Sequence, residues 1–358
     1  MHILLNAQTW LFLTLCSFFY IPALASEDLL IFPEIRALDT NGDSSKEPDT
    51  AASVDLFATA QYGKLRLLGE IFISENDVAA ERLQIGYEFV PDNSIWLGRF
   101  HNPIGYWNIQ YHHGNYLQTS ISRPEIAKLE HNGGLFPSHL FGVLLETTQY
   151  TGNGAQDYTF AAGTSPELRP VFNKQGLSGL VLHPLEIANP GKGRHKLNLT
   201  ARFAYRPDTT ENTQIGLFAT HVEIAISGSS ADAVALSTAG LFAHWEMQNL
   251  TINSSLFFTR DTVESGASRS SGSFSSGYLQ LDYLFNNHWI LFARAEDTVS
   301  ENADPYLNLM QNFSARGQVA GLRWDFTRRQ ALKLEVSQKD RAGKTFITTG
   351  LNWTAMFP

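Results

Sequence analysis

Cysteine is almost missing from this chain of 358 residues, in which Cys16 stands alone. No disulfide can form within one chain, so an exported protein with this sequence must be stabilised by packing and hydrogen bonds. A basic surplus is missing too, because the formal net charge is −9. Nucleic acid is bound by concentrated positive charge, so no nucleic-acid partner is expected.

Long apolar runs are confined to the first 25 residues. The run within residues 10–21 is too short to cross a bilayer, and it is followed by Ala23-Leu24-Ala25, a small-x-small sequence typical of a cleavage site. We therefore predict a signal peptide over residues 1–25, cleaved before Ser26. No apolar run of 18 or more residues follows, so no transmembrane helix is predicted.

Catalytic motifs are also lacking. The sequence has no G-x-S-x-G, H-E-x-x-H or P-loop pattern. Nothing marks a nucleophile, a base and an orienting group that would be brought together. An enzyme is not expected, and no cofactor is predicted.

The chain does contain long segments in which apolar and polar residues alternate. In residues 83–89 the apolar side chains are separated by Gln84, Gly86 and Glu88. The same alternation recurs in residues 196–206, 279–285 and 331–337. Such segments are strands with one apolar and one polar face. Their length of about 9–13 residues suits a tilted membrane strand better than a soluble β-sandwich, which is the alternative.

The connections favour a closed, antiparallel transmembrane β-barrel, an all-β fold. Very short turns are predicted at 91–93, 247–249 and 286–287, whereas residues 261–273 and 300–313 read as long polar loops. Short turns at one end and long loops at the other are typical of outer-membrane barrels. The last strand ends in Phe357, the aromatic ending of many bacterial barrels, although Pro358 follows it.

The alternating segments pair into sixteen strands. The pairs are 52–61/64–73, 80–90/94–101, 138–149/156–164, 174–183/196–206, 213–224/234–246, 250–260/274–285, 288–299/314–326 and 330–339/345–357. Residues 28–38 and part of 112–122 would make eighteen. Residues 26–51 are thus an N-terminal segment or a first strand and loop, and residues 52–358 are the barrel.

Residues 102–137 form the longest irregular segment of the chain, and they are too apolar to lie free in water. A barrel of about sixteen strands has a lumen that its own side chains cannot fill. Irregular backbone at membrane depth must be buried in protein or line a cavity. We therefore expect residues 102–137 to fold into the lumen as a constriction loop.

The stretch before this loop resembles Gram-negative outer-membrane porins, and particularly relatives of the phosphate-selective porins. It matches their Gly-Arg-Phe-x-x-Pro-x-Gly sequence at Gly98, Arg99, Phe100, Pro103 and Gly105. The resemblance implies an outer-membrane channel for passive diffusion of small hydrophilic solutes or ions. No run of lumen lysines is present, so phosphate selectivity is not carried over. A closed structural or adhesive barrel and a metal-binding uptake channel are the alternatives.

The pore constriction is expected to be lined by charged, aromatic and histidine side chains of this region. They are Arg99, His101, Tyr106, Trp107, His112, His113, Arg123 and Glu125. Imidazole suits zinc or copper, but the histidine spacing fits no standard zinc pattern, so His112 and His113 are only weak metal candidates. The expected partners are outer-membrane lipid and lipopolysaccharide, the barrel assembly machinery through the last strand, small solutes, and further copies in a homotrimer.

Overall fold

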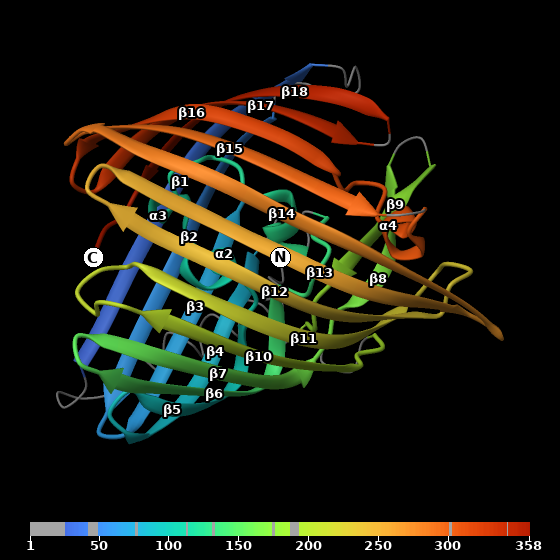
Figure 1. The fold of residues 1–358 in the computed structure, drawn as a ribbon, viewed down its shortest axis with the longest axis horizontal. Helices are drawn as coiled ribbons and strands as arrows, with labels where there is room; N and C mark the ends of the chain where they lie inside the picture. Colours follow the sequence, from blue (N-terminus) through green and yellow to red (C-terminus); the bar gives the residue numbers. More distant parts are fainter. Residues whose placement is uncertain are drawn as a thin grey trace, which may run out of the picture.

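The computed structural model describes residues 26–41, 49–75, 78–111, 114–130, 133–173, 176–186, 193–300, 303–341 and 343–358. Sixteen antiparallel strands form a closed barrel, and two further strands lie outside its wall (Figure 1). The predicted all-β barrel of sixteen strands is confirmed. Among the described residues, no helix is long and apolar enough to cross a membrane.

The wall strands follow one another along the chain, except at one insertion. They are β1 (Ser26–Asn41), β2 (Asp49–Tyr62), β3 (Leu65–Ser74), β4 (Val78–Val90), β5 (Asn93–His101), β6 (His139–Thr151), β7 (Gly154–Thr164), β10 (Leu197–Arg206), β11 (Gln214–Ile226), β12 (Ala233–Met247), β13 (Leu250–Ser265), β14 (Ser268–Asn286), β15 (Trp289–Ser300), β16 (Arg316–Thr327), β17 (Gln330–Arg341) and β18 (Lys344–Ala355). β1 pairs with both β18 and β2, which closes the barrel.

Two strands differ from the sequence-based assignment. Residues 176–183 of the predicted wall strand 174–183 form β9 (Gly176–His183), which pairs with β8 (Glu167–Asn173) in a hairpin, and β7 pairs directly with β10 instead. Its place among the sixteen wall strands is taken by β1, which the predicted pairs did not include. The hairpin's alternating leucines mislead because Leu180 and Leu182 pack into the protein core rather than on the outer wall. With β1 in the wall, the connection between β5 and β6 lies at the long-loop end.

The strand ends also differ at one predicted loop. Residues 261–273 continue β13 and β14, and the turn is confined to the residues around Gly266, whose φ is +58°. Serine and threonine fill this stretch, and the strand ladder satisfies their backbone groups. The polar composition of residues 261–273 therefore shows where the hairpin extends beyond the apolar belt. It does not show where the strand pairing ends.

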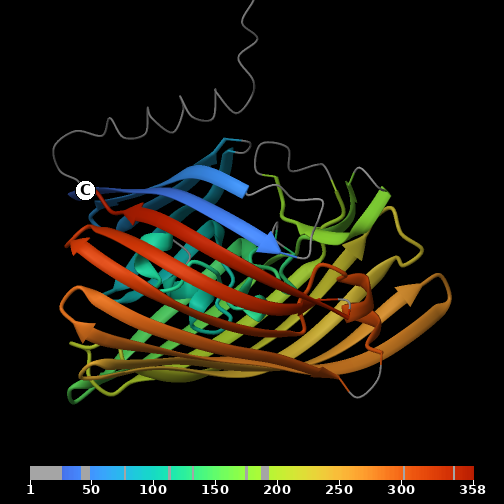
Figure 2. The ribbon, with the colours of Figure 1, turned by 90° about the horizontal axis from the view of Figure 1, so that it is seen from above.

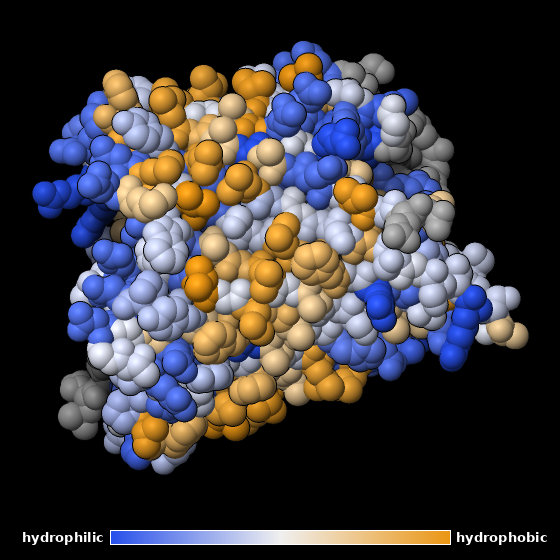
Figure 3. Space-filling model, viewed as in Figure 1, coloured by the Kyte–Doolittle hydropathy of each residue, from blue (hydrophilic) through white to orange (hydrophobic). Residues whose placement is uncertain are grey.

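The outer wall is apolar across its middle. Large exposed side chains such as Leu217, Leu241 and Leu256 alternate with buried neighbours along their strands. Hydrophobic side chains gather over the middle of the strands and hydrophilic ones at both ends (Figure 3). Exposed aromatic side chains cluster near the short turns, namely Tyr62, Tyr87, Phe89, Tyr150, Tyr205, Trp245, Tyr283, Phe285, Trp324 and Phe326. An apolar belt with an aromatic edge is what a membrane-spanning barrel presents to lipid.

The connection between β5 and β6 lies inside the barrel (Figures 1 and 2). It contains the short helices α2 (Trp107–Gln110) and α3 (Gly114–Leu117) and the turn η1 (Glu125–Ala127). We call residues 102–138 the inner loop. The predicted position inside the lumen is confirmed by its contacts with the inner wall, described next. A further helix, α4 (Pro305–Leu309), lies in the connection between β15 and β16.

Candidate functional site: the inner loop and the lumen wall

The base of the inner loop is closed by two asparagines. The backbone N–H of Asn102 donates to the Ser138 carbonyl over 2.8 Å. The Asn108 side chain donates to the carbonyls of Asn102 and Ser138 over 2.7 and 3.2 Å. These bonds join the end of β5 to the start of β6, so the loop leaves and re-enters the wall at one point.

The first half of the loop packs through aromatic rings on the wall of β11–β14. Tyr106 stacks on His244 of β12 with ring centroids 4.3 Å apart. Trp107 meets Tyr278 of β14 edge to face at 5.9 Å. Both loop rings are almost fully buried. Tyr106 and Trp107 therefore fill lumen space instead of lining an open surface, and inward phenylalanines such as Phe257 complete the same apolar cluster.

The second half of the loop is held by charged side chains of the adjoining inner wall, β15–β17. Arg294 of β15 donates to the Ser120 hydroxyl and to the Ser122 carbonyl and hydroxyl, over 2.8–3.1 Å. Glu335 of β17 accepts from the backbone N–H of Ile121 over 2.7 Å. These side chains replace the strand partners that an irregular backbone lacks.

The cationic neighbours on β16 and β17 bond to loop carbonyls in the same way. Lys333 Nζ donates to the carbonyls of Gln118, over 2.7 Å, and of Asn115. Arg323 donates to the carbonyls of Tyr116 and Gln118 over 2.7 and 2.9 Å. A run of loop carbonyls thus faces a run of wall cations, and the loop is fixed at this side of the lumen.

Arg123 bonds to two carbonyls of the loop itself. Its Nε donates to the Ala127 carbonyl over 2.8 Å and its Nη1 to the Tyr111 carbonyl over 3.0 Å. Burial lowers the pKa of the Arg123 guanidinium to about 9, so it remains charged at neutral pH. Its bonds fold the loop back on itself.

Glu125 is the ionic anchor of the loop. Its carboxylate lies 2.7 Å from Lys128 Nζ and 2.6 Å from Lys339 Nζ on β17. Burial by itself would raise the pKa of Glu125, but Lys339 and Lys128 hold it at about 2. The Ser314 backbone N–H, in the connection after α4, also donates to this carboxylate.

Histidines and glutamates meet where β5 ends and β6 begins, and we call this cluster of His101, His139, Glu70, Glu81 and Glu130 the rim. His139 lies with Nε2 2.8 Å from Glu81 and Nδ1 3.2 Å from Glu130, which also accepts the His139 backbone N–H. His101 lies 3.5 Å from Glu70, and the two imidazole centroids are 5.2 Å apart. The rim is a buried ionic network that fixes both ends of the loop.

Arg99 lies next to this network, and its side chain is buried. It pairs in register with Phe141, an exposed residue of the outer face. Its guanidinium donates to the Leu185 carbonyl over 3.2 Å and approaches Glu81 to 3.9 Å. These two contacts join Arg99 to the connection between β9 and β10 and to the glutamate that also holds His139.

The structure therefore gathers Tyr106, Trp107, Arg123 and Glu125 in the inner loop and leaves Arg99 and His101 at its rim. The predicted residues His112 and His113 lie outside the described residues. Within the described ranges, no three His, Cys, Asp or Glu side chains converge as metal ligands. The strand alternation does place Arg294, Lys333 and Glu335 inward, but the sequence gives no sign that they bond to the loop.

Neither a protein-family model nor a curated protein sequence matches this chain. Several solved structures, however, are similar to it in fold. The anion-selective porin from Comamonas acidovorans superposes with a TM-score of 0.63 at 12% identity, over 93% of this chain and 100% of that one. The outer membrane channel DcaP of Acinetobacter baumannii gives a TM-score of 0.63 at 11% identity, over 94% and 99%.

The trimer form of OmpT, an outer membrane protein of Vibrio cholerae, gives a TM-score of 0.57 at 9% identity, over 94% and 100% of the two chains. At these identities the likeness shows the fold, which is that of Gram-negative outer-membrane porins. The closer resemblance to phosphate-selective porins stays a prediction.

We expect Glu125→Gln to release the loop anchor, because Lys128 and Lys339 then share no buried carboxylate. Removing one partner of a buried ion pair costs about 3–5 kcal/mol. Denaturant unfolding in detergent micelles measures this free energy. The matched control is Glu264→Gln, whose partner Arg269 is 76% exposed. That change should cost less than about 1 kcal/mol.

The same pair predicts a pH dependence. The pKa of Glu125 is lowered in the folded protein, so its stabilisation is fully present above about pH 4.3. It is lost as the pH falls towards about 2. Wild type should lose stability across this window by more than Glu125→Gln does. Equal losses would mean that Glu125 does not anchor the loop.

Proposed function

We propose that the protein is an outer-membrane channel for passive diffusion of small hydrophilic solutes or ions, narrowed by the inner loop. The observation that carries the proposal is a closed barrel with an apolar outer belt, a charged inner wall and a loop bonded within it. Stability alone does not require a barrel with so wide a lumen, whereas passage of a solute does. The proposal includes export by the predicted signal peptide, residues 1–25, which lie outside the described residues.

The solute path in this proposal follows the wall of β3–β7 and β10. The hydrogen bonds of the loop backbone and of its side chains described above reach mainly β15–β17. On the other wall the charged side chains pair with each other instead. Arg66 lies 2.6 Å from Glu88, and Arg206 lies 2.7 Å from Asp157, with side chains 31%, 15%, 26% and 21% exposed. Partly exposed, paired charges keep a path wet.

We propose that the predicted constriction residues act in two groups. Tyr106, Trp107, Arg123 and Glu125 build and hold the obstruction. Tyr106, Trp107 and Glu125 are buried within it, and Arg123 donates to two of its backbone carbonyls. Arg99 and His101 fix the rim. The ionic preference then comes from the exposed pairs on the opposite wall. Two cations and two carboxylates balance there, which predicts weak selectivity.

Single-channel recording in planar bilayers under a salt gradient tests both parts. Wild type should conduct with a reversal potential near zero. Arg66→Ala with Arg206→Ala leaves Glu88 and Asp157 without their cations and should shift the reversal potential towards cation selectivity. Charge controls ion preference where the path is narrow.

The matched control is Arg316→Ala, which removes an exposed guanidinium from the outer face, where it pairs with Asp297. This variant should leave the reversal potential unchanged. If folded wild type gave no conductance, the closed structural or adhesive barrel would replace the channel. An equal shift in the control would place the path elsewhere.

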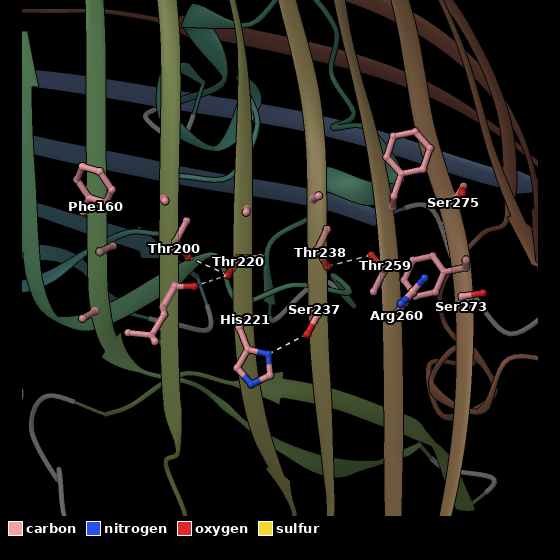
Figure 4. A pocket seen from close by; sticks show the side chains of 18 of the residues that line it. Phe160, Thr200, Thr220, His221, Ser237, Thr238, Thr259, Arg260, Ser273 and Ser275 are labelled. Carbon is pink, nitrogen blue, oxygen red and sulfur yellow. Dashed lines mark hydrogen bonds between the residues drawn. The ribbon is translucent and has the colours of Figure 1, made fainter.

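The outer wall carries a feature that bears on the partners. Ala201, Ala219 and Ala239 lie side by side across β10–β12. Together with bulkier neighbours they line a hollow of about 1200 Å³ (Figure 4). In the adjacent row, His221, Ser237 and Arg260 are paired in register. The His221 ring bonds to Ser237 over 2.9 Å.

A lipid-facing arginine costs about 2–4 kcal/mol at the membrane midplane, and less near its surface. We propose that further copies of this chain cover the hollow in a homotrimer, with lipid and lipopolysaccharide around the rest of the belt. The trimer form of the similar OmpT barrel supports the proposal. Insertion by the barrel assembly machinery through β18 is part of the same proposal.

Ala219→Trp with Ala239→Trp should fill the hollow and convert a trimer to monomers, because the neighbour can no longer approach. Light scattering in mild detergent measures the protein mass. Leu351→Trp, on the outer face of β18, is the control and should stay trimeric. A monomeric wild type, or a trimer that survives the tryptophans, contradicts this interface.

A further inference from the structure

A glutamate projects into the lumen from the wall that the proposed solute path follows. On β6, Val143 lines the hollow of the outer wall, so Glu146, three residues further along the strand, faces inward. Its register neighbours are Ser94 on β5 and Thr159 on β7, and both are short and buried. Glu146 is exposed between them. Its carboxylate is therefore accessible to a solute in the lumen.

The carboxylate of Glu146 is held in place by an indole. Trp96 on β5 donates from Nε1 to Glu146 over 2.9 Å. The Trp96 ring packs directly on the backbone of Gly86 on β4, since a Cβ there would lie 2.4 Å from a ring atom. Only 8% of Trp96 is exposed. The ring is thus fixed against the wall, and its N–H fixes one oxygen of the carboxylate.

No cation neutralises Glu146 at contact distance. Among the described residues, no Lys, Arg or His lies within ion-pair distance of its carboxylate. Arg82 and Arg202 interact with it electrostatically from further away. Arg82 donates to Glu70 and Arg202 to Gln214, each over 2.8 Å. For ions that pass at a distance, these guanidiniums offset the charge of Glu146. A group that touches Glu146 meets the carboxylate directly.

We propose that Glu146 binds the cationic group of a passing solute, so that the channel favours small solutes that carry an ammonium. This inference rests on the proposed channel function and names a class of solute for it. An ammonium has three donors, and a carboxylate has about four acceptor positions. Trp96 occupies one of these positions and acts as a positioning residue. Because the site is open to the lumen, the contact is weak enough for the solute to leave, as conduction requires.

Tracer uptake into liposomes that contain the purified full-length protein tests the proposal. The probes are L-lysine and L-norleucine, which is lysine without the side-chain ammonium. Wild type should take up lysine about fivefold faster than norleucine, the factor that contact between two unit charges in water supplies. Glu146→Gln should remove most of this preference and leave norleucine uptake unchanged, because the amide keeps the shape of the side chain.

Trp96→Phe tests the positioning role, since it keeps an aromatic ring on Gly86 and removes the N–H donor. It should lower the preference for lysine, but less than Glu146→Gln does. Added to Glu146→Gln, it should not change the ratio of lysine to norleucine uptake any further. If Trp96 only maintained the wall, Trp96→Phe would change the uptake of both amino acids by the same factor.

The matched control is Glu223→Gln, which removes an exposed carboxylate of the outer face, where it pairs with Lys196. Its uptake ratio should equal that of wild type. An equal loss of preference in this control would mean that total charge, and not contact with Glu146, sets the ratio, which overturns the inference.

Two further results separate this inference from the channel itself. Equal uptake of both amino acids by wild type, or a preference that survives Glu146→Gln, overturns the role of Glu146 and leaves the channel standing. Folded wild type that takes up neither amino acid and conducts no ions contradicts the proposed function, and this inference with it.

Discussion

The bonds from inner-wall side chains to the backbone of the inner loop are the interactions on which the rest of the lumen depends. A loop at membrane depth has no strand partner and little water, and each unpaired backbone group is costly there. Arg294, Lys333 and Glu335 supply the missing partners. The loop in turn covers these three side chains.

This arrangement makes the lumen asymmetric. The loop fills the side of β11–β17 with buried rings and anchored backbone, while the pairs Arg66–Glu88 and Arg206–Asp157 on the other wall stay partly exposed. The outer wall is asymmetric as well, because the alanine row and Arg260 interrupt an otherwise bulky apolar belt. The hollow on the outer wall therefore overlaps, at β11–β14, the strands whose inner face the loop covers.

The sequence predicted the barrel because alternation is a local signal that every long strand carries. Sixteen strands followed from it, yet one of them was assigned to the wrong segment. In β9 the leucines alternate as in a wall strand but pack against the loops. In β1 the strand begins at the predicted cleavage site and contains Pro33, so its pattern was weaker.

The site was predicted in part. Residues 102–137 stood out because their aromatic content is too high for a surface loop, and their place inside the barrel followed from the size of the lumen. The residues that bond to this loop could not be predicted from the sequence. Glu125 meets Lys339 across 214 residues of sequence, and Arg294 meets Ser120 across 174. Such contacts depend on how the barrel closes, which no local pattern records.

The central claim is that the inner loop obstructs a conducting lumen. Deleting residues 106–118 removes the buried rings of α2 and the backbone that Arg323 and Lys333 hold, while the strand ladder of the wall stays intact. Single-channel conductance of this variant, measured beside wild type in planar bilayers, is the most direct test. We expect a higher conductance from a deletion protein that still shows the heat-modifiable migration of a folded barrel. An unchanged conductance from such a folded deletion protein would place the loop outside the conduction path and contradict the account.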